Sequence, residues 1–213
     1  MDTPRQEYYD KRGKILVKNL RKRHFDAWYC QSRQQALSMA MELIGKDDTI
    51  GWGGALSAQQ IGLMDTLERE GYHTFNRAKC TTAEERLQCA RDCMFADVFL
   101  TGANAISLTG ERVNIDGTGN RVAAIVYGPK KILVIAGMNK VADSLEDAIR
   151  RARTIAAPTN KQRFPDKITP CQITGSCEDC TSDGCICNQV LVTRNCSPAG
   201  RIQFILVGEE LGF

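Results

Sequence analysis

The feature of this chain that most constrains its fold is the alternation of short apolar segments with longer amphipathic ones. Strands are expected where β-branched and other apolar residues cluster, at 25–30, 49–54, 72–75, 97–101, 131–136, 189–193 and 201–207. Helices are expected between several of these segments, at 32–44, 57–70, 82–94, 117–127 and 144–156. Ser32, Ser57 and Thr82 are each followed three residues later by Gln or Glu, which is typical of a helix start. This alternation predicts an α/β fold with an open, mostly parallel sheet and helices on both faces.

The chain is expected to form one domain with three parts. Residues 1–24 are expected to form a basic helix, residues 25–170 the α/β core, and residues 171–213 a small Cys-rich extension with two closing strands packed on the same domain. A length of 213 residues with 43% hydrophobic and 25% charged residues is ordinary for a globular protein. Residues 157–170 contain three prolines and no periodicity, so a linker or surface crossing is expected there.

The charge pattern and the polar N-terminal residues limit the expected partners. The net charge is +3, and residues 1–24 hold eight Lys or Arg against three Asp or Glu. We interpret this arm as a solvated helix face, because no nucleic-acid-binding motif accompanies it. A run such as 132–136 is far shorter than the about 20 residues that span a bilayer. We therefore expect a cytosolic protein without a membrane or nucleic-acid partner.

Two glycine-rich or polar loops follow expected strands. In the first, Gly51, Gly53 and Gly54 precede Ser57, so that backbone N–H groups at a helix start can approach an anion. The loop matches neither the Walker A motif nor the full dinucleotide-binding motif. A tight turn followed by a capped helix is the alternative.

The second loop, 116–121, gathers a carboxylate, a hydroxyl, an amide and a guanidinium in six residues. Asp116 is a candidate general base, and Arg121 can grip a carboxylate or phosphate. The alternative is an Asp-Gly turn with Asn120 capping the next helix. Lys140 follows another central strand and is, with Asp116, a candidate catalytic residue. The remaining ligand-binding candidates near these loops are Thr101, Gly102, Asn104, Gly117, Thr118, Gly119 and Asn120.

These loops are expected to meet in space. The carboxyl ends of parallel strands lie at one edge of a sheet, and ligands bind there. We therefore predict one cleft that binds anions, lined by the loops at 51–57, 101–104, 116–121 and 137–140.

Ten cysteines are many for a cytosolic chain, and six of them lie between residues 171 and 196. Cys177 and Cys180 have a two-residue spacing that lets two thiolates share a metal. With Cys171 and Cys187 they form a candidate four-thiolate site for zinc or an iron–sulfur cluster. Reduced thiols without metal, or a disulfide formed on purification, are the alternatives.

Several segments resemble the LUD domain family, named for lactate utilisation. The segments that carry the resemblance are 101–110, 114–121 and 128–137, with 169–171, 177–180, 186–188 and 208–212 in the tail. The resemblance implies the fold of ribose-5-phosphate isomerases, glucosamine-6-phosphate deaminases and CoA transferases. In that superfamily a glycine-rich loop binds phosphate and a later Asp-Gly loop holds catalytic groups, which correspond here to 51–57 and 116–121. The isomerase loop continues with a further acidic pair, whereas this chain has Thr118, Gly119 and Asn120.

The resemblance also implies a function. Family members in lactate operons work beside iron–sulfur subunits to oxidise lactate to pyruvate. We therefore predict a subunit or accessory protein in the oxidation of lactate or a related 2-hydroxy acid, with a small anionic ligand and iron–sulfur oxidoreductase subunits as partners. A stand-alone enzyme acting on a sugar phosphate or acyl-CoA through Asp116 and Lys140 is the alternative. A Cys-ligated metal-binding interaction module is the second alternative.

Overall fold

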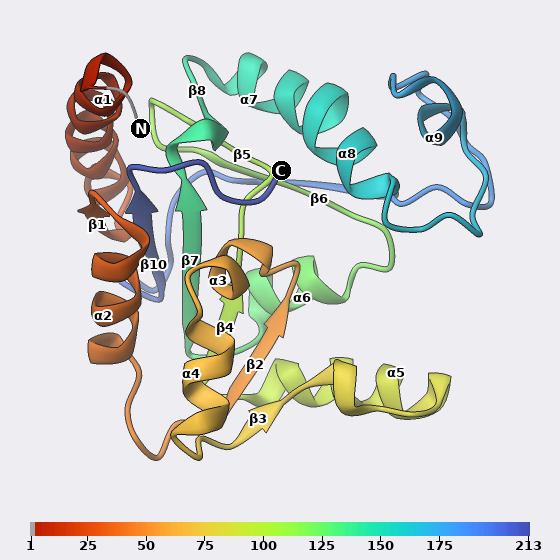
Figure 1. The fold of residues 1–213 in the computed structure, drawn as a ribbon, viewed down its shortest axis with the longest axis horizontal. Helices are drawn as coiled ribbons and strands as arrows, with labels where there is room; N and C mark the ends of the chain where they lie inside the picture. The colour runs from red at the N-terminus through yellow and green to blue at the C-terminus, as the bar shows by residue number, and fades with distance from the viewer. Residues whose placement is uncertain (1–2) are drawn as a thin grey trace.

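The computed structural model describes residues 3–213 and is built around a six-stranded sheet (Figure 1). The strands lie in the order β1-β10-β7-β4-β2-β3, and every neighbouring pair is parallel. Their bounds are β1 Asp26–Cys30, β2 Ile50–Gly53, β3 Thr74–Phe75, β4 Val98–Thr101, β7 Lys131–Gly137 and β10 Ile202–Val207. The predicted open parallel sheet is confirmed.

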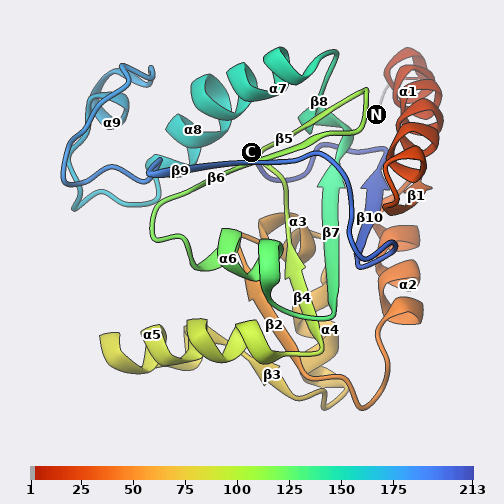
Figure 2. The ribbon, with the colours of Figure 1, turned by 180° about the vertical axis from the view of Figure 1, so that it is seen from behind.

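Helices cover both faces of this sheet, as Figures 1 and 2 show. Alternate residues of β7 point to opposite faces, so Val134 belongs to one apolar core and Ile135 to the other. The core that contains Val134 is covered by α1 (Thr3–Lys22) and α6 (Asn120–Tyr127). The core that contains Ile135 is covered by α2 (Arg33–Leu43), α3 (Leu56–Gln60) and α4 (Leu63–Arg69). Helix α1 lies within the predicted basic segment 1–24, whose first two residues are outside the described part of the chain.

A second, mixed sheet lies beside the first, with the order β8-β5-β6-β9. Its strands are β5 Ala105–Ser107, β6 Arg112–Asp116, β8 Val141–Ala142 and β9 Gln189–Thr193. Strands β5 and β6 pair antiparallel and form a hairpin around Thr109 and Gly110. Helix α7 (Leu145–Arg151) packs its buried Ala148 against this sheet.

One predicted helix start is wrong. Ser57 does not cap a helix, because α3 begins before it at Leu56 and ends at Gln60. Gly62, with φ +79°, then separates α3 from α4. By contrast, α5 (Ala83–Asp92) begins with the predicted capping box: the Thr82 side chain accepts the Glu85 N–H, and the Glu85 carboxylate accepts the Thr82 N–H.

The helix predicted for 144–156 continues further than its expected end. It passes from α7 through a π-helical turn at Ala152–Ala156 into α8 (Ala157–Lys161). The irregular segment expected at 157–170 is therefore wrong for its first five residues. Pro158 lies in the first turn of α8, where a missing N–H is tolerated. Pro170 begins the short helix α9 (Pro170–Thr174) in the same way.

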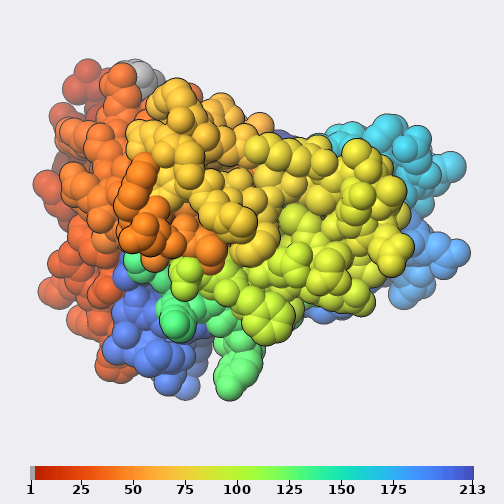
Figure 3. Space-filling view, turned by 90° about the horizontal axis from the view of Figure 1, so that it is seen from below, coloured from red at the N-terminus to blue at the C-terminus, as the bar shows by residue number. Residues whose placement is uncertain are grey.

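The last forty residues contribute to both sheets. Strand β9 pairs with β6, whereas β10 lies between β1 and β7 as the second strand of the main sheet. Between α9 and β9, the Cys-rich loop (residues 175–188) extends from the end of the molecule that α5 also occupies (Figures 1 and 3). Three 3₁₀ turns complete the fold: η1 Arg77–Lys79, η2 Cys93–Phe95 and η3 Met138–Lys140. Within residues 3–213, none of the helices combines the length and apolarity that crossing a bilayer requires.

Candidate functional site

A cleft of about 760 Å³ opens at the carboxyl ends of β2 and β4. The structure brings the two glycine-rich loops together there, with η3 beside them. The predicted site residues that line the cleft are Gly53, Gly54, Asn104, Asp116, Gly117, Thr118, Asn120, Arg121 and Lys140. This edge of the sheet is where the rule for parallel strands places a ligand.

Five predicted ligand-binding residues are not in the cleft lining. They are Gly51 in β2, Ser57 in α3, Thr101 and Gly102 at the end of β4, and Gly119 before α6. Thr101 Oγ1 donates a hydrogen bond to Gly53 O at 2.9 Å, and Gly102 N–H donates one to Gly54 O at 3.1 Å. These bonds join the ends of β2 and β4, so the residues behind the cleft fix the loop that lines it. Gly119 has φ +93°, a conformation that favours glycine, and lies at the N-cap of α6.

Asp116 closes a turn and caps α6. Its Oδ1 accepts the Gly117 N–H at 2.9 Å, and its Oδ2 accepts the Val122 N–H at 3.1 Å. The Arg121 Nε lies 3.7 Å from the same Oδ2. Both carboxylate oxygens therefore accept hydrogen bonds from the chain itself. This agrees with the alternative of an Asp-Gly turn, except that Asp116, rather than Asn120, is the capping side chain.

Arg121 is held with one edge of its guanidinium toward the cleft. Its Nη2 donates hydrogen bonds to Ile115 O and, at 3.3 Å, to Asn104 Oδ1. Its Nη1 has no hydrogen-bond partner among the described residues and lies over Gly54, where a Cβ would be 2.3 Å from Nη1. Gly54 has φ +58°, so both its backbone and the guanidinium require glycine. Burial lowers the pKa of Arg121, and Asp116 opposes that effect.

Lys140 is a buried amine that lines the cleft. Lys140 is only 4% exposed, and its Nζ donates a hydrogen bond to Ser57 Oγ at 3.1 Å. No carboxylate within residues 3–213 forms an ion pair with it. Burial, together with the positive charges of Arg151 and Arg121, lowers the pKa of Lys140 to about 7. A large fraction of Lys140 is therefore an uncharged amine at neutral pH.

Basic residues outnumber acidic ones around the cleft. The basic lining residues are Arg77, Arg121, Lys140, Arg163 and Lys167, and the acidic ones are Asp65, Glu68 and Asp116. Glu68 already forms an ion pair with Lys79 at 3.1 Å and accepts a hydrogen bond from Asn76 at 2.7 Å. The excess positive charge of the lining residues favours an anionic ligand. Sequence reasoning missed three of the cations, in η1 and after α8, because no motif or strand end marks them.

A further arginine beneath the cleft could not be predicted. Arg112 on β6 is fully buried, and its Nη2 donates to Gly102 O at 3.1 Å. Asn114 donates to the same carbonyl at 3.2 Å. Nε and Nη1 of Arg112 have no partner in the described part of the chain. Burial and the neighbouring Arg121 lower the pKa of Arg112 to about 9. Residues Arg112 to Ile115 of β6 are all buried, so both faces of this strand are covered although it carries polar side chains.

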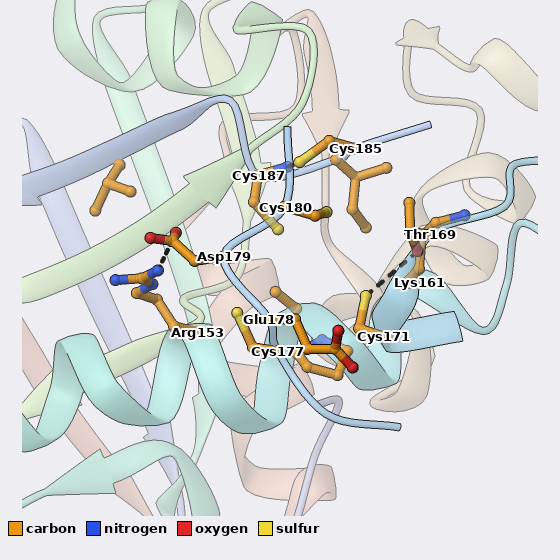
Figure 4. Close-up of a pocket in the computed structure, with 14 residues that line it drawn as sticks. Arg153, Lys161, Thr169, Cys171, Cys177, Glu178, Asp179, Cys180, Cys185 and Cys187 are labelled. Atoms are coloured by element: carbon orange, nitrogen blue, oxygen red, sulfur yellow. Dashed lines mark hydrogen bonds and ion pairs between the residues drawn. The ribbon is translucent and has the colours of Figure 1, made fainter. Parts of the chain in front are cut away.

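A second cavity, of about 260 Å³, lies beneath the Cys-rich loop (Figure 4). Its lining includes the four predicted thiol ligands and a fifth cysteine: Cys171, Cys177, Cys180, Cys185 and Cys187. Burial and the neighbouring sulfurs of three of these residues raise the pKa of Cys187 to about 12. Hydrogen bonds from Ser182 lower the pKa of Cys180. Over residues 3–213, no three Cys, His, Asp or Glu side chains converge as a single metal ion would require.

Comparison with known proteins identifies the family. Residues 13–207 match the LUD domain. The chain belongs to the LUD domain family. The LUD chain is also similar in fold to a DUF162 family protein from Deinococcus radiodurans, with 10% identity, a TM-score of 0.51, and coverage of 95% of this chain and 97% of that one. No curated protein matches the LUD chain.

Two weaker structural similarities are to ribose 5-phosphate isomerases. The Neisseria gonorrhoeae isomerase A has 16% identity and a TM-score of 0.34, over 53% of the LUD chain and 54% of its own. The Methanocaldococcus jannaschii enzyme has 16% identity and a TM-score of 0.33, over 53% and 55%.

Proposed function

We propose that the inner end of the cleft binds the carboxylate of a small 2-hydroxy acid, lactate or a related one, and that the LUD chain is a subunit or accessory protein in its oxidation. One observation carries this proposal: Arg121 and Lys140 lie on either side of the Gly54–Gly102 contact, and Lys140 has no acidic partner. A Cβ on Gly102 would lie 3.1 Å from Gly54 O and 3.7 Å from Lys140 Nζ. A bound carboxylate supplies the missing counter-charge.

The two cations suit different parts of such a ligand. The free Nη1 edge of Arg121 can donate to a carboxylate oxygen in a charge-assisted hydrogen bond. The uncharged form of Lys140, whose pKa is about 7 in the ligand-free cleft, can accept the proton of the 2-hydroxyl group, and the ligand carboxylate then supplies the counter-charge of the ammonium that forms. The two electrons then pass one at a time to an acceptor, for which we propose an iron–sulfur oxidoreductase subunit, and the C2 proton is released to water, leaving the 2-oxo acid.

The size of the cleft favours a second candidate. A volume of about 760 Å³ is much larger than a three-carbon acid needs. Arg77, Arg163 and Lys167 also line it, and they could hold a phosphate at a distance from Lys140. A stand-alone enzyme acting on a sugar phosphate or an acyl-CoA is therefore the alternative.

Calorimetric titration with L-lactate, D-lactate, ribose 5-phosphate and acetyl-CoA distinguishes the two. We expect lactate to bind the natural chain and to bind Lys140→Met and Arg121→Gln at least about tenfold more weakly, equivalent to about 1.4 kcal/mol. Lys18→Met is the matched control, because Lys18 is exposed on α1 and outside the cleft. Binding of the phosphate or the CoA ester without lactate would favour the second candidate, and a folded chain that binds none of the four would refute both.

The proposed partner needs a separate test. Affinity purification of the tagged full chain from cells grown on lactate should recover an iron–sulfur oxidoreductase subunit in near-stoichiometric amount. If the lysate contains that subunit and the tagged chain is still recovered alone, the assignment as a subunit or accessory protein is refuted.

A further inference from the structure

We propose that the cavity beneath the Cys-rich loop binds an iron–sulfur cluster of the four-iron, four-sulfide type. Its protein ligands are the thiolates of Cys171, Cys177, Cys180 and Cys187. The proposal concerns a different cavity from the anion cleft and does not depend on what the cleft binds.

The four sulfurs come from separate parts of the chain and face one space. Cys171 is on α9, Cys177 and Cys180 lie in the first half of the loop, and Cys187 lies just before β9. Figure 4 shows their sulfur atoms around the same cavity, which α8 closes on one side. Ala157, Pro158, Ile186 and Val190 supply apolar wall, so the sulfurs share a partly water-excluding pocket.

The size of the cavity favours a cluster over a single ion. Zinc bonded to four thiolates at about 2.3 Å draws the sulfurs close around one point. In the described residues no three potential ligands converge in that way, although five cysteines line the cavity. A four-iron cluster places an iron at each thiolate and keeps the sulfurs further apart around a larger body. A cavity of about 260 Å³ has room for such a body, and it is larger than one ion fills.

The loop also has no apolar core of its own to fix its shape. None of residues 171–190 is buried, and between Gly175 and Asn188 the chain forms neither helix nor strand. Few backbone hydrogen bonds lie within it, one of them from Cys185 N–H to Ser182 O at 2.8 Å. Yet the loop joins α9 to β9, which is paired along its length with β6. A ligand bound by four thiolates supplies the missing order, because its binding free energy becomes folding free energy.

Cys185 provides a built-in control. Its sulfur accepts the Cys187 N–H at 3.3 Å, and Figure 4 shows it at the rim of the cavity beside the Cys187 backbone. Cys187 instead packs against the core of the second sheet. The sulfur of Cys185 is thus used in a hydrogen bond within the loop, and we assign the fourth cluster ligand to Cys187.

The test is anaerobic reconstitution of the full chain with ferrous iron and sulfide, in parallel with zinc alone. We expect about four irons and four acid-labile sulfides per chain, a broad visible absorbance that bleaches on reduction, and an electron paramagnetic resonance signal of a reduced cluster. Serine at Cys171, Cys177, Cys180 or Cys187 should abolish the four-iron species. Cys185→Ser, and Cys80→Ser outside the lining of this cavity, should retain it.

Other results would overturn the proposal. If the chain binds one zinc ion and no cluster, the cavity is a single-ion site and the cluster proposal is wrong. If the folded chain binds neither zinc nor a cluster, the cysteines are reduced thiols without a metal. Loss of the cluster in Cys185→Ser but not in Cys187→Ser would overturn the ligand assignment. Far-UV circular dichroism of each variant separates loss of ligand from loss of fold, since these cysteines are not in the main core. Lactate titration of the same samples shows whether the anion cleft is still formed.

Discussion

Replacing Lys140 by methionine should stabilise the LUD chain, and the gain should shrink as the pH rises. Lys140 is buried without an acidic partner, so the folded chain holds its charged form at a cost. Methionine keeps most of the aliphatic stem and removes the charge. It also removes the bond to Ser57 Oγ, which contributes about 1 kcal/mol.

The magnitude follows from the lowered pKa. A pKa that falls from 10.5 to about 7 corresponds to about 5 kcal/mol between the charged and neutral forms, at about 1.4 kcal/mol per pKa unit. Because the pKa is lower in the folded state, the unfolded state binds more protons between these two values, and stability of the natural chain rises with pH there. The penalty is fully present below pH 7 and is gone above pH 10.5. The gain from methionine should therefore fall by about 3 kcal/mol between about pH 6 and about pH 9.

Urea unfolding of both chains at about pH 6 and about pH 9 measures this difference. Titrations elsewhere in the molecule affect both chains equally and cancel in the comparison. Lys18→Met, at an exposed position of α1, should change stability by less than about 0.5 kcal/mol at either pH. An equal gain or loss from Lys140→Met at both pH values would refute the reasoning, because it would mean that the amine has the same pKa folded and unfolded.

Three further substitutions test how the cleft is built. Gly54→Ala should lower stability by about 1–3 kcal/mol and weaken lactate binding, because φ is +58° and the new Cβ meets Arg121; unchanged titration curves would contradict this. Asp116→Asn should cost about 1 kcal/mol in urea unfolding, because an amide oxygen can replace only one of the two carboxylate oxygens that accept backbone N–H groups, yet bind lactate no less tightly, since a negative charge leaves the cleft. Thr101→Val removes a buried bond to Gly53 O and should cost about 1–2 kcal/mol in thermal unfolding; a neutral result would mean that this bond does not join β2 and β4.

The elements of the fold could be predicted from local pattern, whereas their order could not. Strand β7 is predicted well because its apolar run is buried on both faces, and the Thr82 capping box marks α5 by local hydrogen bonding. The position of β10 between β1 and β7 depends on pairing with residues far away in the chain. Periodicity identifies a strand, but it does not carry the identity of the strand's neighbours.

Some parts of the candidate site could likewise be predicted from local sequence, and others could not. The rule that ligands bind at the carboxyl ends of parallel strands was enough to gather the 51–57 and 116–121 loops. It did not separate the residues that line the cleft from those, such as Thr101, that fix the loops from behind. It also missed Arg163 and Lys167, which reach the cleft only because the helix from α7 continues through Pro158.

The anion cleft and the cysteine cavity share a wall at Ile186. This residue lines both, and a Cβ on Gly117 would lie 3.2 Å from the Ile186 Cα. Asn188 Nδ2 donates to Gly117 O at 3.0 Å, so the end of the Cys-rich loop is tied to the turn that Asp116 closes. The glycine at 117 is explained by this close crossing rather than by a left-handed turn. A ligand that orders the Cys-rich loop therefore also fixes one side of the cleft that Arg121 and Lys140 line.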